Sequence, residues 1–301
     1  MSYALEKWIH PFSRLHKIPV FKRVWLYLAL MTAYTALVYW FVANIFATRF
    51  LKEAASIGFA SLILGLLMVF RTNSAYERWW EGRKLWGQLV NESRNLCIKA
   101  KKYANVSNSE KVHLGQLVVS FAYSLMHHLR DKRPNDNLPG VRPIEELGSA
   151  HLPVQIAEAI YDKIQQWYKA QALDGFTLGQ LDVHARALMD ICGGCERIKS
   201  TPLALSYRAF IRQGIALNLL AMPWYSASTL AFWWSLPLII VTSYFLIGLE
   251  LIAEDIEDPF GKDGDDLPIE IICDKISQTV SEIISGSAAD REIDQMILVR
   301  S

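Results

Sequence analysis

The chain has 301 residues, and its 31 Lys and Arg against 30 Asp and Glu give a formal net charge of +1. This balance, with no basic block in the chain, excludes a nucleic-acid partner from our expectations. Charge is also unevenly distributed, because residues 24–48, 54–70 and 213–249 contain no charged side chain. About 20 apolar residues cross a hydrocarbon core of about 30 Å. The third run has room for two crossings, so the sequence predicts four transmembrane helices.

The distribution of Lys and Arg predicts the orientation of these helices. Residues 1–23 carry several basic side chains, the loop at 49–53 carries only two, and residues 71–102 are rich in both Lys and Arg. The positive-inside rule therefore places both termini and the middle segment in the cytoplasm. We expect a multi-pass protein of the bacterial inner (plasma) membrane, with the lipid bilayer as a partner.

The expected organisation has five parts. They are a cytosolic amino-terminal segment (1–23), two transmembrane helices (24–70), a cytosolic helical region (71–207), two further transmembrane helices (208–252) and a cytosolic carboxyl-terminal region (253–301).

The second uncharged run is expected not to end at the membrane surface. Residues 54–101 contain no Pro, so one long helix is predicted to start in the bilayer and continue into the cytoplasm. Further helices are expected over 105–205, interrupted by a polar loop at 131–143. In the later part of that region, apolar positions recur at helical spacing: Leu181, His184, Leu188, Ile191 and Cys195. No strand alternation is present, so the predicted class is all-α.

Two prolines lie in the third uncharged run. Pro223, followed by Trp224, Tyr225 and Ser226, is predicted to mark the turn between the last two crossings. Pro237 is expected inside the last helix, where neighbouring groups must satisfy the carbonyl that it leaves free.

Three sequence motifs resemble one known family. Residues 70–83 read FRTNSAYERWWEGR, residues 195–202 read CERIKSTP, and residues 258–266 read DPFGKDGDD. Their order and spacing over nearly the whole chain resemble the bacterial branch of the bestrophin family. The resemblance implies a homopentameric ion channel that conducts small inorganic ions through one central pore. The second helix of each subunit would line a transmembrane neck, followed by a cytosolic vestibule and a second constriction.

The resemblance assigns the neck to Leu62, Leu66 and Phe70. These residues are four apart, so they share one stripe of a helix. Five copies would form three apolar rings able to gate by dewetting. The alternative from periodicity alone is ordinary helix packing.

Ion selectivity is expected from the chemistry of these rings. Animal bestrophins place further aromatic residues in the neck, and aromatic edges carry partial positive charge that can meet an anion. Here only Phe70 is aromatic, whereas Leu62 and Leu66 offer no such edge. The neck therefore does not favour anions, and the resemblance to bacterial members, which look cation-permeable, implies a channel permeable to monovalent cations such as sodium. The alternative is a chloride-selective or other anion-selective channel like the animal members.

The lower constriction is expected at the start of the second cytoplasmic helix, at Leu178 and Leu181. Subunit packing is the alternative role for both residues.

An acidic cluster follows the last uncharged run, with candidate metal ligands at Asp255, Asp258, Asp263 and Asp266. The corresponding region of animal bestrophins binds calcium, and calcium prefers six to eight oxygen ligands. A divalent cation, calcium or zinc, is thus the ligand this cluster would take. Lys262 lies among the carboxylates, and a helix cap or solvated turn is the competing interpretation. No cofactor is required by any motif.

Cys192 and Cys195 form a CxxC sequence, but no second such pair exists to complete a zinc site. The intervening Gly193 and Gly194 are expected to allow close helix packing. His184 is expected to be a hydrogen-bonded histidine. No nucleophile triad or phosphate-binding loop is present, so an enzyme is not expected.

Two other classes of membrane protein are alternatives to a channel: a secondary transporter and a membrane-anchored enzyme. A secondary transporter would normally show internal repeats and charged groups at mid-membrane, and the uncharged runs contain neither. A membrane-anchored enzyme would need a cytosolic active site, for which the CxxC and the acidic cluster are the candidates.

Overall fold

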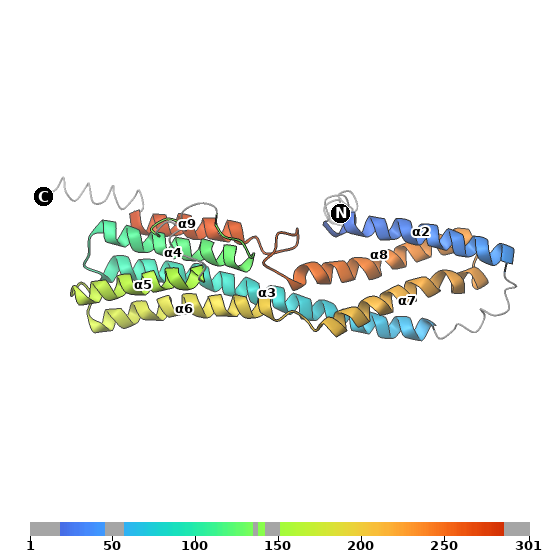
Figure 1. Ribbon diagram of the computed structural model, residues 1–301, viewed down its shortest axis with the longest axis horizontal. Helices are drawn as coiled ribbons and strands as arrows, with labels where there is room; N and C mark the ends of the chain where they lie inside the picture. Colours follow the sequence, from blue (N-terminus) through green and yellow to red (C-terminus); the bar gives the residue numbers. More distant parts are fainter. Residues whose placement is uncertain (1–18, 46–56, 135–137, 142–150, 286–301) are drawn as a thin grey trace, which may run out of the picture. The chain divides into compact units, whose positions relative to one another are not determined.

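The computed structural model describes residues 19–45, 57–134, 138–141 and 151–285. Within these ranges all regular structure is helical, which confirms the all-α prediction (Figure 1). The helices are α2 (Pro19–Ile45), α3 (Ile57–Tyr103), α4 (Asn108–Leu129), α5 (Leu152–Lys169), α6 (Gly175–Ser200), α7 (Leu205–Thr229), α8 (Phe232–Glu257) and α9 (Ile269–Ser285).

Helix α3 is continuous over 47 residues, from Ile57 to Tyr103. It contains no Pro, and it passes from the uncharged run into the charged sequence without interruption. The predicted long helix is therefore confirmed. Its first residues as predicted, 54–56, lie outside the described part of the chain.

The chain forms two compact units, and the three boundaries between them along the chain do not coincide with the ends of the apolar runs. The first unit comprises residues 1–79 and 202–266, and the second comprises residues 80–201 and 267–301. The expected carboxyl-terminal region, 253–301, is thus divided. The acidic loop, residues 258–266, lies in the first unit, and α9 lies in the second.

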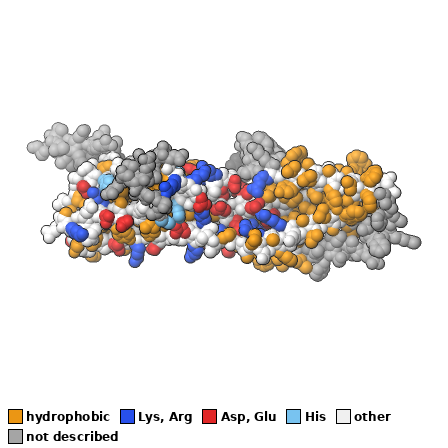
Figure 2. Space-filling model, in the orientation of Figure 1, with side chains coloured by type: hydrophobic (Ala, Val, Ile, Leu, Met, Phe, Trp, Pro, Cys, Tyr) orange, Lys and Arg blue, Asp and Glu red, His pale blue; other side chains and the backbone are white. Residues whose placement is uncertain are grey.

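In the first unit, helices α2, α7 and α8 pack on one another (Figure 1). One apolar cluster joins α2 to α8 through Val20, Val24, Leu28 and Leu251. The outward faces of the same helices expose large apolar side chains, and Figure 2 shows hydrophobic side chains gathered on this unit. Residues 23–44 of α2 and 232–257 of α8 are long and apolar enough to cross a membrane. An exposed apolar surface on such helices is what a lipid environment requires.

The predicted turn at Pro223 is wrong. Helix α7 continues through Pro223 to Thr229, and the chain turns at Leu230 and Ala231. The Ser226 hydroxyl donates to the Pro223 carbonyl at 3.2 Å, and the Leu230 amide donates to the Ser226 carbonyl at 2.7 Å. The carbonyl that Pro223 frees is that of Leu219, four residues earlier, and neighbouring helices in a membrane bundle let such a helix continue past its proline. Pro237 lies inside α8, as expected.

In the second unit, α4 packs against α5 and α9, and α5 packs against α6 (Figure 1). The predicted stripe of α6, from Leu181 to Cys195, is buried, which confirms its helical periodicity. Side chains of Lys, Arg, Asp and Glu cover much of the visible surface of this unit (Figure 2). Its helices also carry well-formed caps, including a capping box between Asp174 and Thr177 at the start of α6.

The CxxC segment of α6 lies against α3 in this unit, and Gly194 makes the contact. A Cβ atom on Gly194 would lie 3.0 Å from two methyl carbons of Leu85, whereas one on Gly193 would meet nothing within 4 Å. Close packing is therefore confirmed at Gly194. Burial raises the pKa of Cys192 to about 12 and also raises that of Cys195, so neither thiol is a reactive thiolate near neutral pH.

Candidate functional site

The predicted neck residues share one exposed face of α3. The exposed fractions are 70% for Leu62, 56% for Leu66 and 55% for Phe70. Leu64 and Met68, on the opposite face, are buried. One chain therefore leaves an apolar stripe without cover, and such a stripe requires lipid, a second subunit or a pore to face.

Contacts with α7 fix which face of α3 is exposed. Leu64 and Met68 pack with Ile211, Ile215 and Leu219 of α7. The Asn218 amide donates to the Ser61 hydroxyl at 2.8 Å, and the Tyr207 hydroxyl donates to the Leu67 carbonyl at 3.3 Å. Polar bonds of this kind between helices hold a rotation that apolar packing alone would leave loosely defined.

One helical position after the stripe, Arg71 begins a network of charges. Its side chain is fully buried, and its Nη2 donates to Glu257 Oε2 at 2.7 Å. Its Nε lies 3.5 Å from Glu250 Oε2. An unpaired charge at such a site would be very costly, so the two carboxylates of α8 are a condition for placing Arg71 there.

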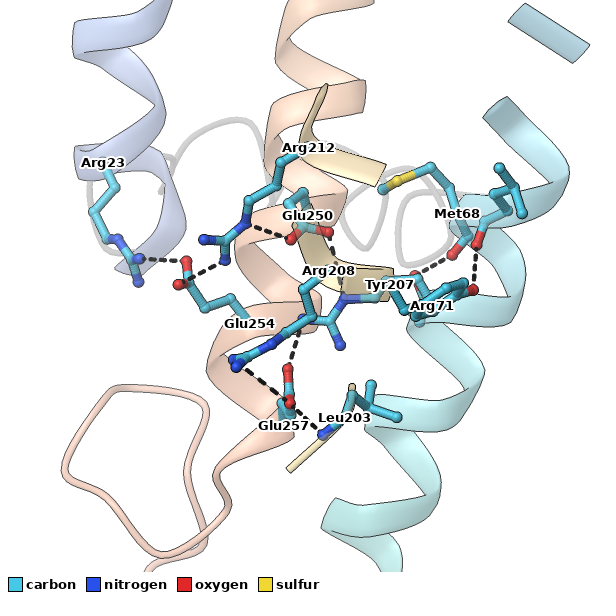
Figure 3. A network of polar contacts seen from close by, with 12 residues as sticks. Arg23, Met68, Arg71, Leu203, Tyr207, Arg208, Arg212, Glu250, Glu254 and Glu257 are labelled. Carbon is cyan, nitrogen blue, oxygen red and sulfur yellow. Dashed lines mark hydrogen bonds and ion pairs between the residues drawn. The ribbon is translucent and has the colours of Figure 1, made fainter. Parts of the chain in front are cut away.

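Three further arginines complete the network that Figure 3 shows. Arg212 of α7 pairs with Glu250 at 2.9 Å and Glu254 at 2.8 Å. Arg23 of α2 pairs with Glu254 at 3.1 Å and also with Asp255. Arg208 lies 3.8 Å from Glu257. Four basic and four acidic side chains thus cancel in charge, and they join α2, α3, α7 and α8.

Glu257 also receives backbone and side-chain bonds outside these ion pairs. Its Oε1 accepts from the Leu203 amide at 3.0 Å, just before α7 begins. Its carbonyl accepts from Arg78 Nε at 2.9 Å. The last residue of α8 therefore holds α3 and the start of α7 at once. Arg71 and Arg78 thus both bind the carboxyl end of α8 within one chain.

Three carboxylates of this network were not predicted from the sequence: Glu250, Glu254 and Glu257. A signal was available, because their spacing of four and three places all three on one face of α8, directly after an uncharged run. Their partners are far away in sequence, and for this reason the spacing alone could not name them.

Of the residues predicted for the lower constriction, only Leu178 has accessible surface. Leu181 is fully buried within its own chain, where it belongs to the core of the second unit. A side chain with no exposed surface cannot line a pore, so the prediction for Leu181 is not supported. Leu178, which lies in the first turn of α6, is partly exposed and stays a prediction.

The four predicted acidic ligands do not gather around one point. Asp255 is paired with Arg23, and Asp266 Oδ2 instead accepts from the Asp263 amide at 2.6 Å. Gly261 permits this fold of the loop, since a Cβ there would lie 2.6 Å from Asp266 Oδ2. Among described residues, three potential ligand atoms come within 4.8 Å of one another elsewhere, at His128, His151 and Glu196.

Asp266 has an unusual acidity. Burial raises its pKa to about 7; the bond from the Asp263 amide opposes this rise, and the charges of Asp263, Asp258 and Asp255 add to it. The acidic loop therefore contains one carboxyl group that titrates near neutral pH.

In the second unit, His184 is hydrogen-bonded, as predicted. Its Nδ1 lies 2.6 Å from Glu92 Oε2 of α3, and its side chain is almost fully buried. The pair ties α6 to α3 and leaves His184 without the exposed nitrogen that a metal ligand would need.

Comparison with known proteins identifies relatives over most of the chain. The family model described as Bacterial/Fungal Bestrophin protein matches residues 4–282. A protein of Nostoc sp. named voltage-dependent anion channel-forming protein is 34% identical and covers 78% of each chain. A Synechocystis sp. protein of the same name is 34% identical over 74% of this chain and 75% of its own.

Among solved structures, a bacterial bestrophin homologue from Klebsiella pneumoniae superposes with a TM-score of 0.79 at 24% identity. The match covers 86% of this chain and 97% of that one. At this identity the likeness concerns the fold. The family model, the two relatives and the helical fold together give one conclusion: the chain belongs to the bacterial and fungal bestrophin family.

Proposed function

We propose that this chain is the subunit of a homopentameric ion channel, with α3 lining the pore and Leu62, Leu66 and Phe70 forming its neck. The observation that carries this proposal is the exposed apolar stripe of α3, opposite a face that its own chain buries. Around a symmetry axis, five such stripes would enclose three apolar rings.

A four-crossing topology, with both termini in the cytoplasm of a bacterial inner membrane, belongs to the same proposal. Helices α2 and α8 support it by their length and hydropathy. Helix α7 and the first part of α3 would be the other two crossings. The charge network around Arg71 is consistent with a place near the inner surface, because it follows the uncharged part of α3.

For selectivity we propose anion conduction. The support is that the two relatives with 34% identity are both named voltage-dependent anion channel-forming proteins. The phenyl edge of Phe70 at the end of the stripe is the group that would meet an anion.

Cation conduction is the second candidate function. Two turns after Phe70, the stripe reaches Glu77, which is exposed. A ring of five carboxylates would favour cations. Leu62 and Leu66 provide no aromatic edges, which was the basis of the sequence prediction of sodium permeability. The comparisons give this prediction no support.

The deciding experiment is the reversal potential of the purified channel in planar bilayers under a tenfold NaCl gradient. A shift towards the chloride equilibrium potential supports anion conduction, and a shift towards the sodium potential supports the second candidate. Under cation conduction, Glu77→Gln should move the reversal potential towards zero. Chemical cross-linking tests the assembly, because a ladder that ends at five subunits is expected, and a monomer or dimer would contradict the pore proposal.

Leu178 as a second constriction, and calcium binding by the acidic loop, are further parts of the proposal. Calcium-dependent gating that is lost in Asp258→Asn would support the latter. Asp258 suits this test because the charge network around Arg71 does not include it.

A further inference from the structure

Three side chains from three helices of the second unit converge on one point. They are His128 in the last turn of α4, His151 at the amino-terminal cap of α5, and Glu196 on α6. Glu196 Oε1 lies 2.8 Å from His128 Nε2, and it is also in contact with His151 Nε2. The three potential ligand atoms all lie within 4.8 Å of one another.

We propose that His128, His151 and Glu196 form a binding site for Zn²⁺ or a similar divalent transition metal. Two imidazole nitrogens and one carboxylate oxygen are a recurrent zinc donor set. Calcium is excluded by chemistry, since it prefers oxygen ligands alone. The site is distinct from the acidic loop and does not depend on the pore proposal.

The distances suit a metal with small adjustments. Tetrahedral zinc with bonds of about 2.0–2.2 Å holds its ligand atoms about 3.3 Å apart. The two nitrogens now contact the same carboxylate oxygen more closely than this, so the rings would retreat by about 0.5–1 Å to admit the ion. The two imidazole rings are neighbours, with centroids 4.1 Å apart and planes tilted by 50°. Both Nε2 atoms face Glu196 Oε1.

The ligands are accessible to an ion from solution. About one third of each side chain is exposed: 34% for His128, 33% for His151 and 36% for Glu196. Partial exposure leaves the fourth position to water. Cys192 is one helical turn before Glu196 and is buried.

Metal binding would replace the hydrogen bonds of His128 and His151 to Glu196, and it would also alter the cap of α5. His151 Nδ1 now accepts from the Val154 amide at 3.3 Å, as the cap of α5. With Nε2 on the metal, the proton of the neutral ring moves to Nδ1, so this bond is lost. The amide lies in the first turn of α5, where water can replace the ring nitrogen. Two His–Glu hydrogen bonds and one long cap bond are thus exchanged for metal bonds that join three helices.

The consequence would be a clamp within the second unit. His151 is 45 residues from Glu196, and His128 is 68 residues from it. A metal there would hold the end of α4 and the start of α5 against α6.

The test uses full-length assembled protein, purified on a cleavable tag without histidine, stripped with EDTA and titrated with ZnCl₂ by calorimetry. We expect one zinc per chain and a higher unfolding temperature with zinc. Glu196→Gln, nearly the same shape, and His151→Gln should each weaken binding more than about 100-fold, beyond the range typical of outer-shell partners. His113→Gln, elsewhere on α4, is the matched control and should bind as the wild type does.

Cobalt gives an independent readout on the wild-type protein. Co²⁺ in a tetrahedral His₂Glu site should produce visible absorption bands that zinc displaces. Failure of the stripped wild type to take up zinc or to develop these bands would overturn the proposal. Unchanged affinity in Glu196→Gln would also overturn it, and gel filtration of each variant verifies that the assembly is intact.

Discussion

Arg71 of α3 and Glu257 of α8 form a buried ion pair at 2.7 Å between residues that are 186 positions apart in the chain. Arg71 directly follows Phe70, the last residue of the exposed stripe. The pair therefore sets the position at which α3 meets α8, and it does so immediately beside the proposed neck. Burial strengthens the attraction between the two charges, and it also adds the free-energy cost of removing both from water.

Removing Arg71 should strongly destabilise the first unit. Arg71→Met removes the fully buried partner of Glu250 and Glu257 and leaves them Arg212 and the more distant Arg208, so the loss should approach the cost of a broken buried pair, about 3–5 kcal/mol. The unfolding temperature of the purified assembly, followed by tryptophan fluorescence, should fall accordingly. Arg197→Gln is the matched control, because Arg197 pairs with Glu81 at an exposed site and its loss should cost about 1 kcal/mol or less. Equal effects of the two changes would show that the buried network does not hold the unit.

The two faces of α3 should respond differently to truncation. Leu66→Ala, on the exposed stripe, should widen the proposed neck and raise the channel's open probability in planar bilayers, with little loss of stability. Leu64→Ala, on the buried face, should lower stability by about 2–5 kcal/mol because it leaves a cavity against α7. The reverse pattern, in which Leu66→Ala unfolds the protein without altering conduction, would place the stripe in subunit packing rather than in the pore.

The two glycines of the CxxC segment offer a matched comparison. Gly194→Val should push α6 away from Leu85 and cost about 1–3 kcal/mol, as overpacking usually does. Gly193→Val, on the same helix but with no atom near its Cβ, should have a much smaller effect. Thermal unfolding of both variants measures the difference. Indistinguishable melting temperatures would show that Leu85 moves aside without cost.

The sequence predicted the elements whose signal is local. Uninterrupted helical sequence without Pro indicated α3, and apolar spacing indicated the buried face of α6 from Leu181 to Cys195. Pro223 misled the prediction because a proline inside a helix and a proline at a turn have the same local signature. What distinguishes them is packing: α7 lies against α2 and α8 and continues past Pro223, and the actual turn at Leu230 carries neither Gly nor Pro.

The sites were predictable only where their residues lie on one helix. Leu62, Leu66 and Phe70 could be grouped by their spacing. The partners of Arg71, and the group of His128, His151 and Glu196, are assembled by packing of separate helices. Leu181 illustrates the opposite error, because helical spacing marks a face without saying whether the core or the pore covers it.

Asp266 should make stability depend on pH near neutrality. Its folded-state pKa of about 7 lies above the usual value of 3.8, so the folded protein binds more protons between these values. Stability from this group is therefore present at low pH and is lost as pH rises from about 4 through 7. Asp266→Asn retains an oxygen for the Asp263 amide and removes the titration. We expect the variant to melt at a higher temperature than the wild type at pH 8 and to show a smaller difference at pH 5.

Glu158→Gln, at an exposed position of α5, should leave the wild-type profile unchanged. If wild type and Asp266→Asn show the same dependence on pH between 5 and 8, the carboxyl of Asp266 is ionised throughout that range and the acidic loop carries no such group.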